Sequence, residues 1–229
     1  MSFLDRYLAG DCEAVWQEMT VQDSEEAEHV TTETMRRVLY NLQILERRLP
    51  EHGYQFNAPT LNPAKPVLRE ATEHDRSEAK FLGPVPMAIS AFYKVIGEVD
   101  LSQDYEQLMQ WPEREAGEPH TELEMLGEYN PLHISAPSYL LQCRVASKDL
   151  IQYPIMPDAA NNAFYSGDSV YIQVPNFGID AELTIGQTFV SYLRQAFRHA
   201  GFHGMPTPNG LQFPKLPWIE EIARELLPM

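Results

Sequence analysis

Glu98 and Asp100 are the two residues whose types and spacing best suit acid–base chemistry. One residue separates them in the segment 97–101, which has the pattern of a short strand, so both carboxyl groups are expected on one face. Two neighbouring carboxyl groups can divide the roles of general acid and general base, as a small hydrolase or lyase requires. An acidic recognition surface and simple solvation of a strand end are the other interpretations, and the residues leave all three open.

His199 and His203 form a second candidate site, because a spacing of four residues on a helix presents both imidazoles to one metal ion. Gly201 lies between them and is expected to end that helix, and the sequence offers no clear third ligand. We therefore expect no metal site. We interpret the pair as helix-end histidines, which the helix dipole favours when the imidazole is charged.

The two cysteines, Cys12 and Cys143, are too few for a disulfide framework. Neither has a lysine or histidine beside it that would activate a thiolate, so both thiols are expected to be buried and inert. The polar stretch 161–168 could bind a polar ligand, but its composition favours an ordinary turn.

The common catalytic motifs are missing from the sequence. It has no glycine-rich dinucleotide or phosphate loop, no HExxH, no GxSxG and no CxxC. We therefore assign no catalytic residue, no metal and no cofactor, and expect a protein that is not an enzyme.

The segment 98–128 concentrates negative charge, with ten acidic residues against one basic residue, Arg114. It shows little periodicity, so we expect an exposed excursion. Recognition of a basic partner is one reason to tolerate such mutual repulsion, and a solubility surface is the other. Trp111 would supply the aromatic anchor that protein interfaces favour. The expected partner-binding residues are Glu98, Asp100, Asp104, Glu106, Trp111, Glu113 and Glu115.

The whole chain is also acidic, with 229 residues and a formal net charge of −16. Nucleic acids and anionic membranes demand clustered positive charge, so neither is expected as a partner. The sequence has no apolar run of about 18 residues that would cross a membrane, and its first residues lack the pattern of a signal peptide. We expect a cytoplasmic protein, and the sequence leaves its oligomeric state open.

Residues 1–53 are expected to form an N-terminal helical extension. A short helix over 3–19 should break near Gly10, and a capping pattern at Asp23 and Glu26 should start a longer one. The apolar residues of the longer helix recur at helical spacing up to Pro50, which should end it. They are Met35, Val38, Leu39, Leu42, Leu45 and Leu49.

Residues 54–85 contain four prolines and a charged run, which predicts a long connection. It is either a lid-like loop or a linker that holds a short charged helix. The remaining residues, 86–229, are expected to form the α+β core. Pro86 should open its first helix and Gly97 should follow the end of that helix.

Four further strands are expected in this core, at 132–134, 139–145, 151–156 and 169–174. Pro154 should place its strand at a sheet edge. Thr184 and Gln187 should cap a helix that ends at Gly201, and Pro217 should open the last helix. Together these elements predict an α+β class with a central, mainly antiparallel sheet flanked by helices, as one domain overall.

Residues 82–101, from Leu82-Gly83-Pro84 through Phe92-Tyr93 to Gly97-Glu98-Val99, resemble the helix-to-strand step of SMI1/KNR4-like proteins of the SUKH superfamily. Leu45-Glu46-Arg47-Arg48-Leu49 is similar to the helix that precedes this step. Further stretches similar to bacterial members are Ser166-Gly167, 171–175, 189–198 and Gly201-Phe202.

The resemblance implies a non-enzymatic α+β domain. Many bacterial members are thought to be immunity proteins that bind and neutralise toxins, often nucleases, and others serve as interaction modules. The charge of −16 agrees, because an acidic surface can capture a basic toxin and speed their encounter. We therefore expect a protein-binding module, most simply an immunity-type inhibitor of a basic toxin. A small hydrolase or lyase at Glu98 and Asp100, and a regulatory or structural interaction protein, are the alternatives.

Overall fold

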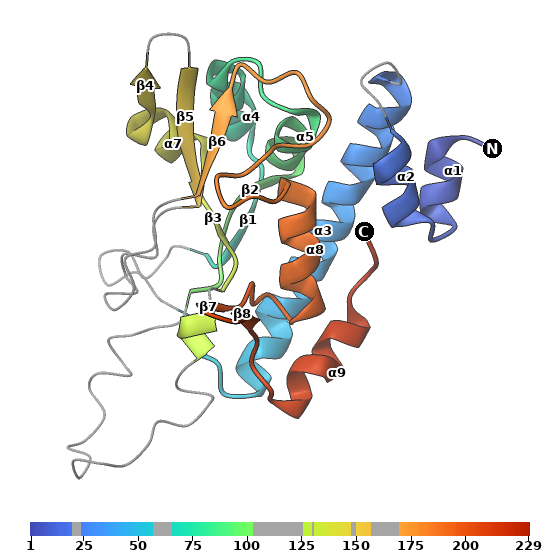
Figure 1. Ribbon diagram of the computed structural model, residues 1–229, viewed down its shortest axis with the longest axis vertical. Helices are drawn as coiled ribbons and strands as arrows, with labels where there is room; N and C mark the ends of the chain where they lie inside the picture. The colour runs from blue at the N-terminus through green and yellow to red at the C-terminus, as the bar shows by residue number, and fades with distance from the viewer. Residues whose placement is uncertain (20–23, 57–65, 103–125, 130, 148–149, 157–169) are drawn as a thin grey trace.

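A computed structural model describes residues 1–19, 24–56, 66–102, 126–129, 131–147, 150–156 and 170–229. The protein has the predicted α+β fold, in which helices surround small antiparallel sheets (Figure 1). In the part of the chain described, no helix combines the length and apolar character needed to cross a membrane.

Three helices form the N-terminal part: α1 (Phe3–Leu8), α2 (Cys12–Glu18) and α3 (Ser24–Glu51). The predicted break between the first two is confirmed at Gly10, whose φ of +105° suits glycine. Asp23 lies outside the described residues. The predicted apolar stripe of α3 is buried apart from Leu39, which is half-buried. α3 runs along the length of the molecule, with α1 and α2 at one end (Figure 1).

The segment 54–85 contains short elements rather than a bare loop. They are β1 (Leu68–Glu70), α4 (Glu73–Ala79) and the 3-10 turn η2 (Lys80–Leu82). α4 is the short charged helix that was one of the two structures predicted for this segment. Thr72 caps it in a reciprocal capping box with Asp75. β1 pairs with a strand of the core, so this segment is part of a sheet.

Helix α5 (Met87–Val95) passes directly into strand β2 (Ile96–Asp100), which corrects the predicted role of Gly97. Gly97 lies inside the strand instead of ending the helix. A Cβ atom there would lie 2.7 Å from Arg69 Nη1, so the glycine makes room for a guanidinium.

The first sheet has the strand order β1-β2-β3, with β3 at His133–Ile134 as predicted, and all its pairs are antiparallel. The second antiparallel sheet has the order β4-β5-β6, with bounds Val145–Ser147, Leu150–Met156 and Val170–Val174. The predicted edge position of 151–156 is therefore wrong, because β5 is the central strand. Its register shifts between Pro154 and Met156, and this irregularity accommodates the missing amide hydrogen of proline.

The predicted strand over 139–145 is also wrong. Most of it belongs to helix α7 (Pro137–Cys143), and only Val145 begins β4. Pro137 occupies the first turn, where a proline is already shaped for a helix. The alternation of apolar residues was therefore misleading in so short a segment.

The C-terminal part contains α8 (Phe189–Arg198), the hairpin of β7 (Met205–Thr207) and β8 (Gly210–Gln212), and α9 (Pro217–Glu225). A further 3-10 turn, η3, spans Leu126–Tyr129. Thr188, not Thr184, caps α8 through the amide of Ser191. The Thr184 hydroxyl instead accepts a hydrogen bond from the amide of Tyr171, at 3.1 Å.

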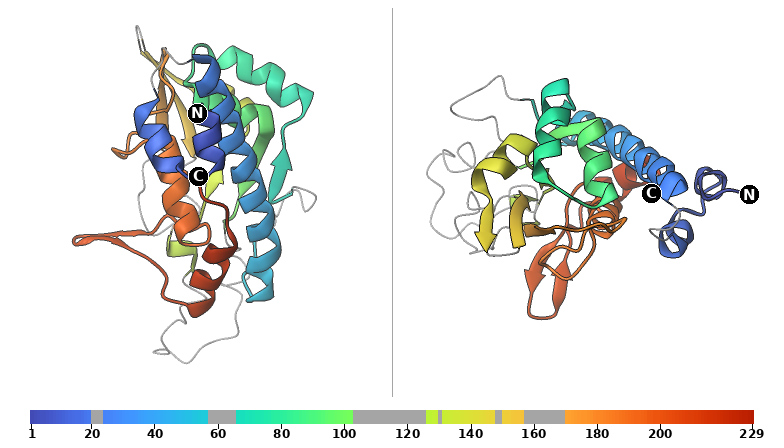
Figure 2. Two further views of the ribbon diagram at one scale, coloured as in Figure 1. Left: turned by 90° about the vertical axis from the view of Figure 1, so that its right-hand side faces the viewer. Right: turned by 90° about the horizontal axis from the view of Figure 1, so that it is seen from above.

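The main hydrophobic core joins residues of α3, α5, α8, α9 and both three-stranded sheets. Seen from above, α3, α4 and α5 lie together on one side of the β4-β5-β6 strands (Figure 2). Six apolar residues of α5, β6 and α8 are buried in this core, and Val170 of β6 is half-buried. The six are Phe92, Tyr93, Ile172, Phe189, Leu193 and Phe197.

Candidate functional site

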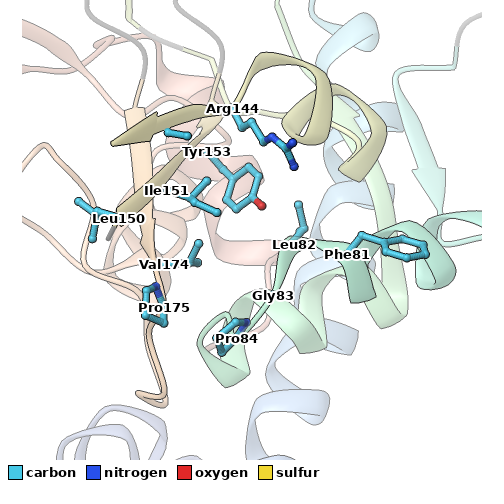
Figure 3. Close-up of a pocket in the computed structure, with 11 residues that line it drawn as sticks. Phe81, Leu82, Gly83, Pro84, Arg144, Leu150, Ile151, Tyr153, Val174 and Pro175 are labelled. Atoms are coloured by element: carbon cyan, nitrogen blue, oxygen red, sulfur yellow. The ribbon is translucent and has the colours of Figure 1, made fainter. Parts of the chain in front are cut away.

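A pocket of about 460 Å³ lies between the β4-β5-β6 sheet and the turn that joins α4 to α5. Residues 81–84 form one wall, and residues of the three strands and Pro175 form the other (Figure 3). Known ligand pockets have volumes of roughly 300–1,000 Å³, so the space suits a small ligand or one or two side chains of a partner.

The register of the sheet explains which side chains face this pocket. Ala146, Ile151 and Val174 are direct cross-strand partners, so they form one row on a single face. Side chains two residues apart on a strand share a face, which places Tyr153 beside Ile151. All four of these residues line the pocket.

Two polar groups stand out against these apolar walls. Tyr153 is 1% exposed, and its hydroxyl points into the pocket, while the Arg144 guanidinium turns toward the same space (Figure 3). Within the described residues, neither side chain makes a hydrogen bond or an ion pair. A cation and a hydroxyl donor therefore remain available to a ligand.

The mouth of the pocket is apolar and exposed. Phe81 is 71% exposed and Leu150 is 36% exposed, although both line the pocket. Among the described lining residues there is no carboxylate, imidazole or thiol. The arrangement thus offers apolar contact, one fixed positive charge and one hydroxyl, which are means of binding.

Glu98 and Asp100 lie on one face of β2, as predicted, because Val99 between them is fully buried. Glu98 is opposite Arg69 in the strand register. Asp100 Oδ1 accepts a hydrogen bond from the Ser102 amide at 3.0 Å, and lies 3.6 Å from His133 Nδ1. Both carboxylates are half-buried among these groups rather than projecting into solvent.

The other predicted partner-binding residues lie outside the described part of the chain. They are Asp104, Glu106, Trp111, Glu113 and Glu115. The acidic surface therefore stays a prediction, and the pocket is a separate feature of the described residues.

Arg69 forms the best-defined ion pair near this sheet, with Asp75. The Arg69 Nη2 atom lies 2.8 Å from Asp75 Oδ1, and Nη1 binds the other carboxylate oxygen. Burial alone would raise the pKa of Asp75, but hydrogen bonds from Arg69 and Thr72 outweigh it and hold that pKa below its usual range.

The two histidines differ from the charged helix-end residues that were expected. His199 follows the last residue of α8 and stacks on Phe213 with ring centroids 3.6 Å apart. Burial and the nearby Arg198 lower its pKa, so the neutral form is favoured. His203 stacks on Tyr192, and its Nε2 atom is 2.6 Å from the side-chain nitrogen of Gln187.

Burial, with a smaller effect of His199, lowers the pKa of His203 to about 4. This imidazole is therefore neutral at pH 7 and accepts the Gln187 hydrogen bond. Among the residues that the structure describes, no group of three or more His, Cys, Asp or Glu side chains could hold a metal ion.

The cysteines are not equivalent. Cys12 is buried as expected, but Cys143 is exposed at the end of α7, which corrects the prediction for that residue.

The sequence reasoning missed the pocket residues Arg144 and Tyr153. The alternation of Ile151, Tyr153 and Ile155 predicts a shared face, but only the fold brings residues 81–84 over that face. Comparisons of the chain with protein-family models, curated proteins and solved structures found no match.

Proposed function

We propose that this protein is a non-enzymatic protein-binding module that contacts its partner around the pocket. The observation that carries the proposal is the apolar mouth, formed by exposed Phe81 and Leu150. Single exposed apolar side chains are common, but apolar residues gathered at a concave site mark interaction surfaces.

Two further features support this surface. Exposed Phe177 follows the pocket residue Pro175 by two positions. β4 is an edge strand, since no described strand pairs with its outer side. An edge strand presents unpaired backbone groups that a partner chain can use.

The specific role that we propose is immunity-type inhibition of a basic toxin in the cytoplasm. It rests on the sequence resemblance to SUKH proteins and on the net charge of −16, which would attract a basic partner. The hydrolase or lyase alternative is less favoured, because Glu98 and Asp100 are half-buried against Arg69 and His133.

The proposal can be tested with the product of any toxin gene found beside the gene for this protein. We expect co-expression to restore growth and the purified proteins to form a stable complex. Phe81→Ala should weaken that complex about tenfold, because an exposed aromatic residue at an interface is a common hot spot. Leu8→Ala is the matched control, since Leu8 is also exposed but lies on α1, away from the pocket (Figure 1).

Full affinity of a Phe81→Ala, Leu150→Ala double variant would show that the mouth of the pocket is not the interface. Turnover of a substrate by the purified protein, lost on Glu98→Gln or Asp100→Asn, would favour the enzyme alternative instead.

A further inference from the structure

We propose that the pocket captures the C-terminal residue of the protein partner, through its carboxylate and an apolar side chain. This inference rests on the proposed protein-binding function and names the part of the partner that the pocket recognises. It follows from the polar groups, the walls and the charge of the pocket.

The hydroxyl of Tyr153 is the first observation. The side chain as a whole is 1% exposed, and its hydroxyl oxygen is accessible from the pocket. The Tyr153 hydroxyl has no hydrogen-bond partner among the described residues, and it points into the pocket (Figure 3). A ligand oxygen in the pocket would accept that hydrogen bond.

Arg144 defines the charge of this ligand. Among the described lining residues it is the only charged one, and no carboxylate of the described chain neutralises it. A guanidinium binds a carboxylate through two parallel hydrogen bonds, which are stronger than bonds between neutral groups. Arg144 is an exposed residue, so its guanidinium is accessible to a ligand, and in a chain that carries −16 it selects an anion by this short-range contact.

The walls define the rest of the ligand. Leu82, Ile151 and Val174 offer apolar surface next to the two polar groups. A C-terminal residue carries its carboxylate and its side chain on the same Cα atom, so a single residue can reach both. An aspartate or glutamate inside a chain would bring two flanking peptide groups to these apolar walls, whereas a C-terminal residue brings only one.

The test uses the purified full chain and three pairs of probes in an NMR titration. Each pair is an acid and its amide: N-acetyl-leucine, N-acetyl-phenylalanine and N-acetyl-phenylalanyl-leucine. We expect the acids to bind roughly fivefold or more tightly than the amides. The largest shifts should be those of the Ile151, Tyr153 and Val174 amides.

Variants show which side chains cause the preference for acids over amides. Arg144→Gln should remove the preference for acids, whereas Arg144→Lys should keep part of it, because lysine has the charge without the planar fork. Tyr153→Phe should weaken the binding of the acids about threefold. Arg198→Gln is the control, since it removes an exposed arginine of α8 and should leave every titration unchanged.

Equal affinity for acid and amide in all three pairs would overturn the inference, as would an acid preference that survives Arg144→Gln. A partner that binds equally well after its C-terminal carboxylate is converted to an amide would also overturn it, while leaving the protein-binding function intact. If the acids bind at the pocket but the protein has no protein partner, the proposed function is overturned. The pocket is then reassigned as a binding site for small free carboxylates.

Discussion

Arg69 and Asp75 show how a single ion pair connects separate elements. Arg69 lies on β1 and Asp75 in the first turn of α4, and the guanidinium also packs over Gly97 of β2. Asp75 is 2% exposed, so its charge depends on the bonds from Arg69 and Thr72. Such a pair holds α4 against the sheet and thereby supports the turn that forms one wall of the pocket.

Asp75→Asn should lower the free energy of unfolding by about 3 kcal/mol near neutral pH, because it removes the buried carboxylate that binds both Arg69 and Thr72. Bonds to the carboxylate hold the pKa of Asp75 below its ordinary value of 3.8. The stabilisation is therefore complete above that pH and is lost as the pH falls below it.

Urea denaturation of wild type and Asp75→Asn checks this prediction. The difference between them should shrink as the solution is acidified below about pH 4. A difference that stays constant with pH would mean that the carboxylate charge contributes nothing.

His203 gives a second pH dependence in a different range. Its pKa falls from 6.5 to about 4 in the folded protein, so between these values the unfolded chain binds a proton that the folded chain does not. The free energy of unfolding should therefore decrease as the pH drops from about 6.5 to about 4, by about 3 kcal/mol in all. His203→Phe keeps an aromatic ring against Tyr192 and should remove this slope.

His74→Phe is the control for this measurement, because His74 is an exposed histidine of α4. It should leave the slope unchanged. An unchanged slope in His203→Phe would assign the titration to another group.

At the scale of elements, the segment that follows α9 packs back onto α3. Asn41 is fully buried, and its side-chain amide donates to the Leu227 carbonyl at 3.0 Å and accepts from the Leu227 amide at 2.7 Å. Arg37 and Arg194 hold the next residues, through the carbonyls of Pro228 and Met229. Side chains of two helices thus take the place of a neighbouring strand for this segment.

Asn41→Ala should release the segment, because it leaves both backbone groups of Leu227 without their buried partners. We expect about 2–3 kcal/mol less stability, and at least roughly tenfold faster hydrogen exchange at the Leu227 amide. Asn209→Ala, in the exposed turn between β7 and β8, should change neither quantity. Unaltered exchange at Leu227 in Asn41→Ala would show that other contacts suffice to hold the segment.

The elements also show what local sequence can and cannot predict. The stripe of α3 and the strands β2, β3 and β6 were predicted, because their apolar periodicity matches the faces that they bury. The strand predicted over α7 is wrong because seven residues fit both periods, and Pro137 favours the start of a helix. β5 was placed at an edge because proline lacks a donor, but a register shift beside Pro154 accommodates it.

Long-range packing explains the remaining errors. Gly97 has the sequence position of a helix end, and only the fold reveals the arginine that needs its space. The candidate site was missed for the same reason, since Arg144 and Tyr153 meet residues 81–84 only in three dimensions. A site formed by residues that are close together in the sequence can be predicted from their spacing, whereas a pocket between distant segments cannot.

At the scale of the whole molecule, the two halves of the chain share one core. Met35 and Leu42 of α3 belong to the same cluster as Phe92 of α5 and Leu193 of α8. A smaller cluster joins α1 and α2 to Ala27 and Val30 of α3. Since burial is distributed in this way, exposed charges can be changed without touching the packing that holds the fold together.

The net charge of −16 gives the last prediction, for a verified basic partner. Reversing Asp104, Glu106 and Glu113 to lysine changes the charge from −16 to −10, because each reversal adds two. If these acids steer the partner, the on-rate should fall about tenfold or more at low salt, and its salt dependence should flatten. The control reverses Glu13, Glu73 and Glu220, exposed residues of three helices, for the same final charge. Stopped-flow association at several salt concentrations separates the two cases. A loss confined to the first variant locates the steering in segment 98–128, and equal losses in both assign it to the total charge. The control variant should keep most of the stability of the wild type, because exposed charges contribute little to it.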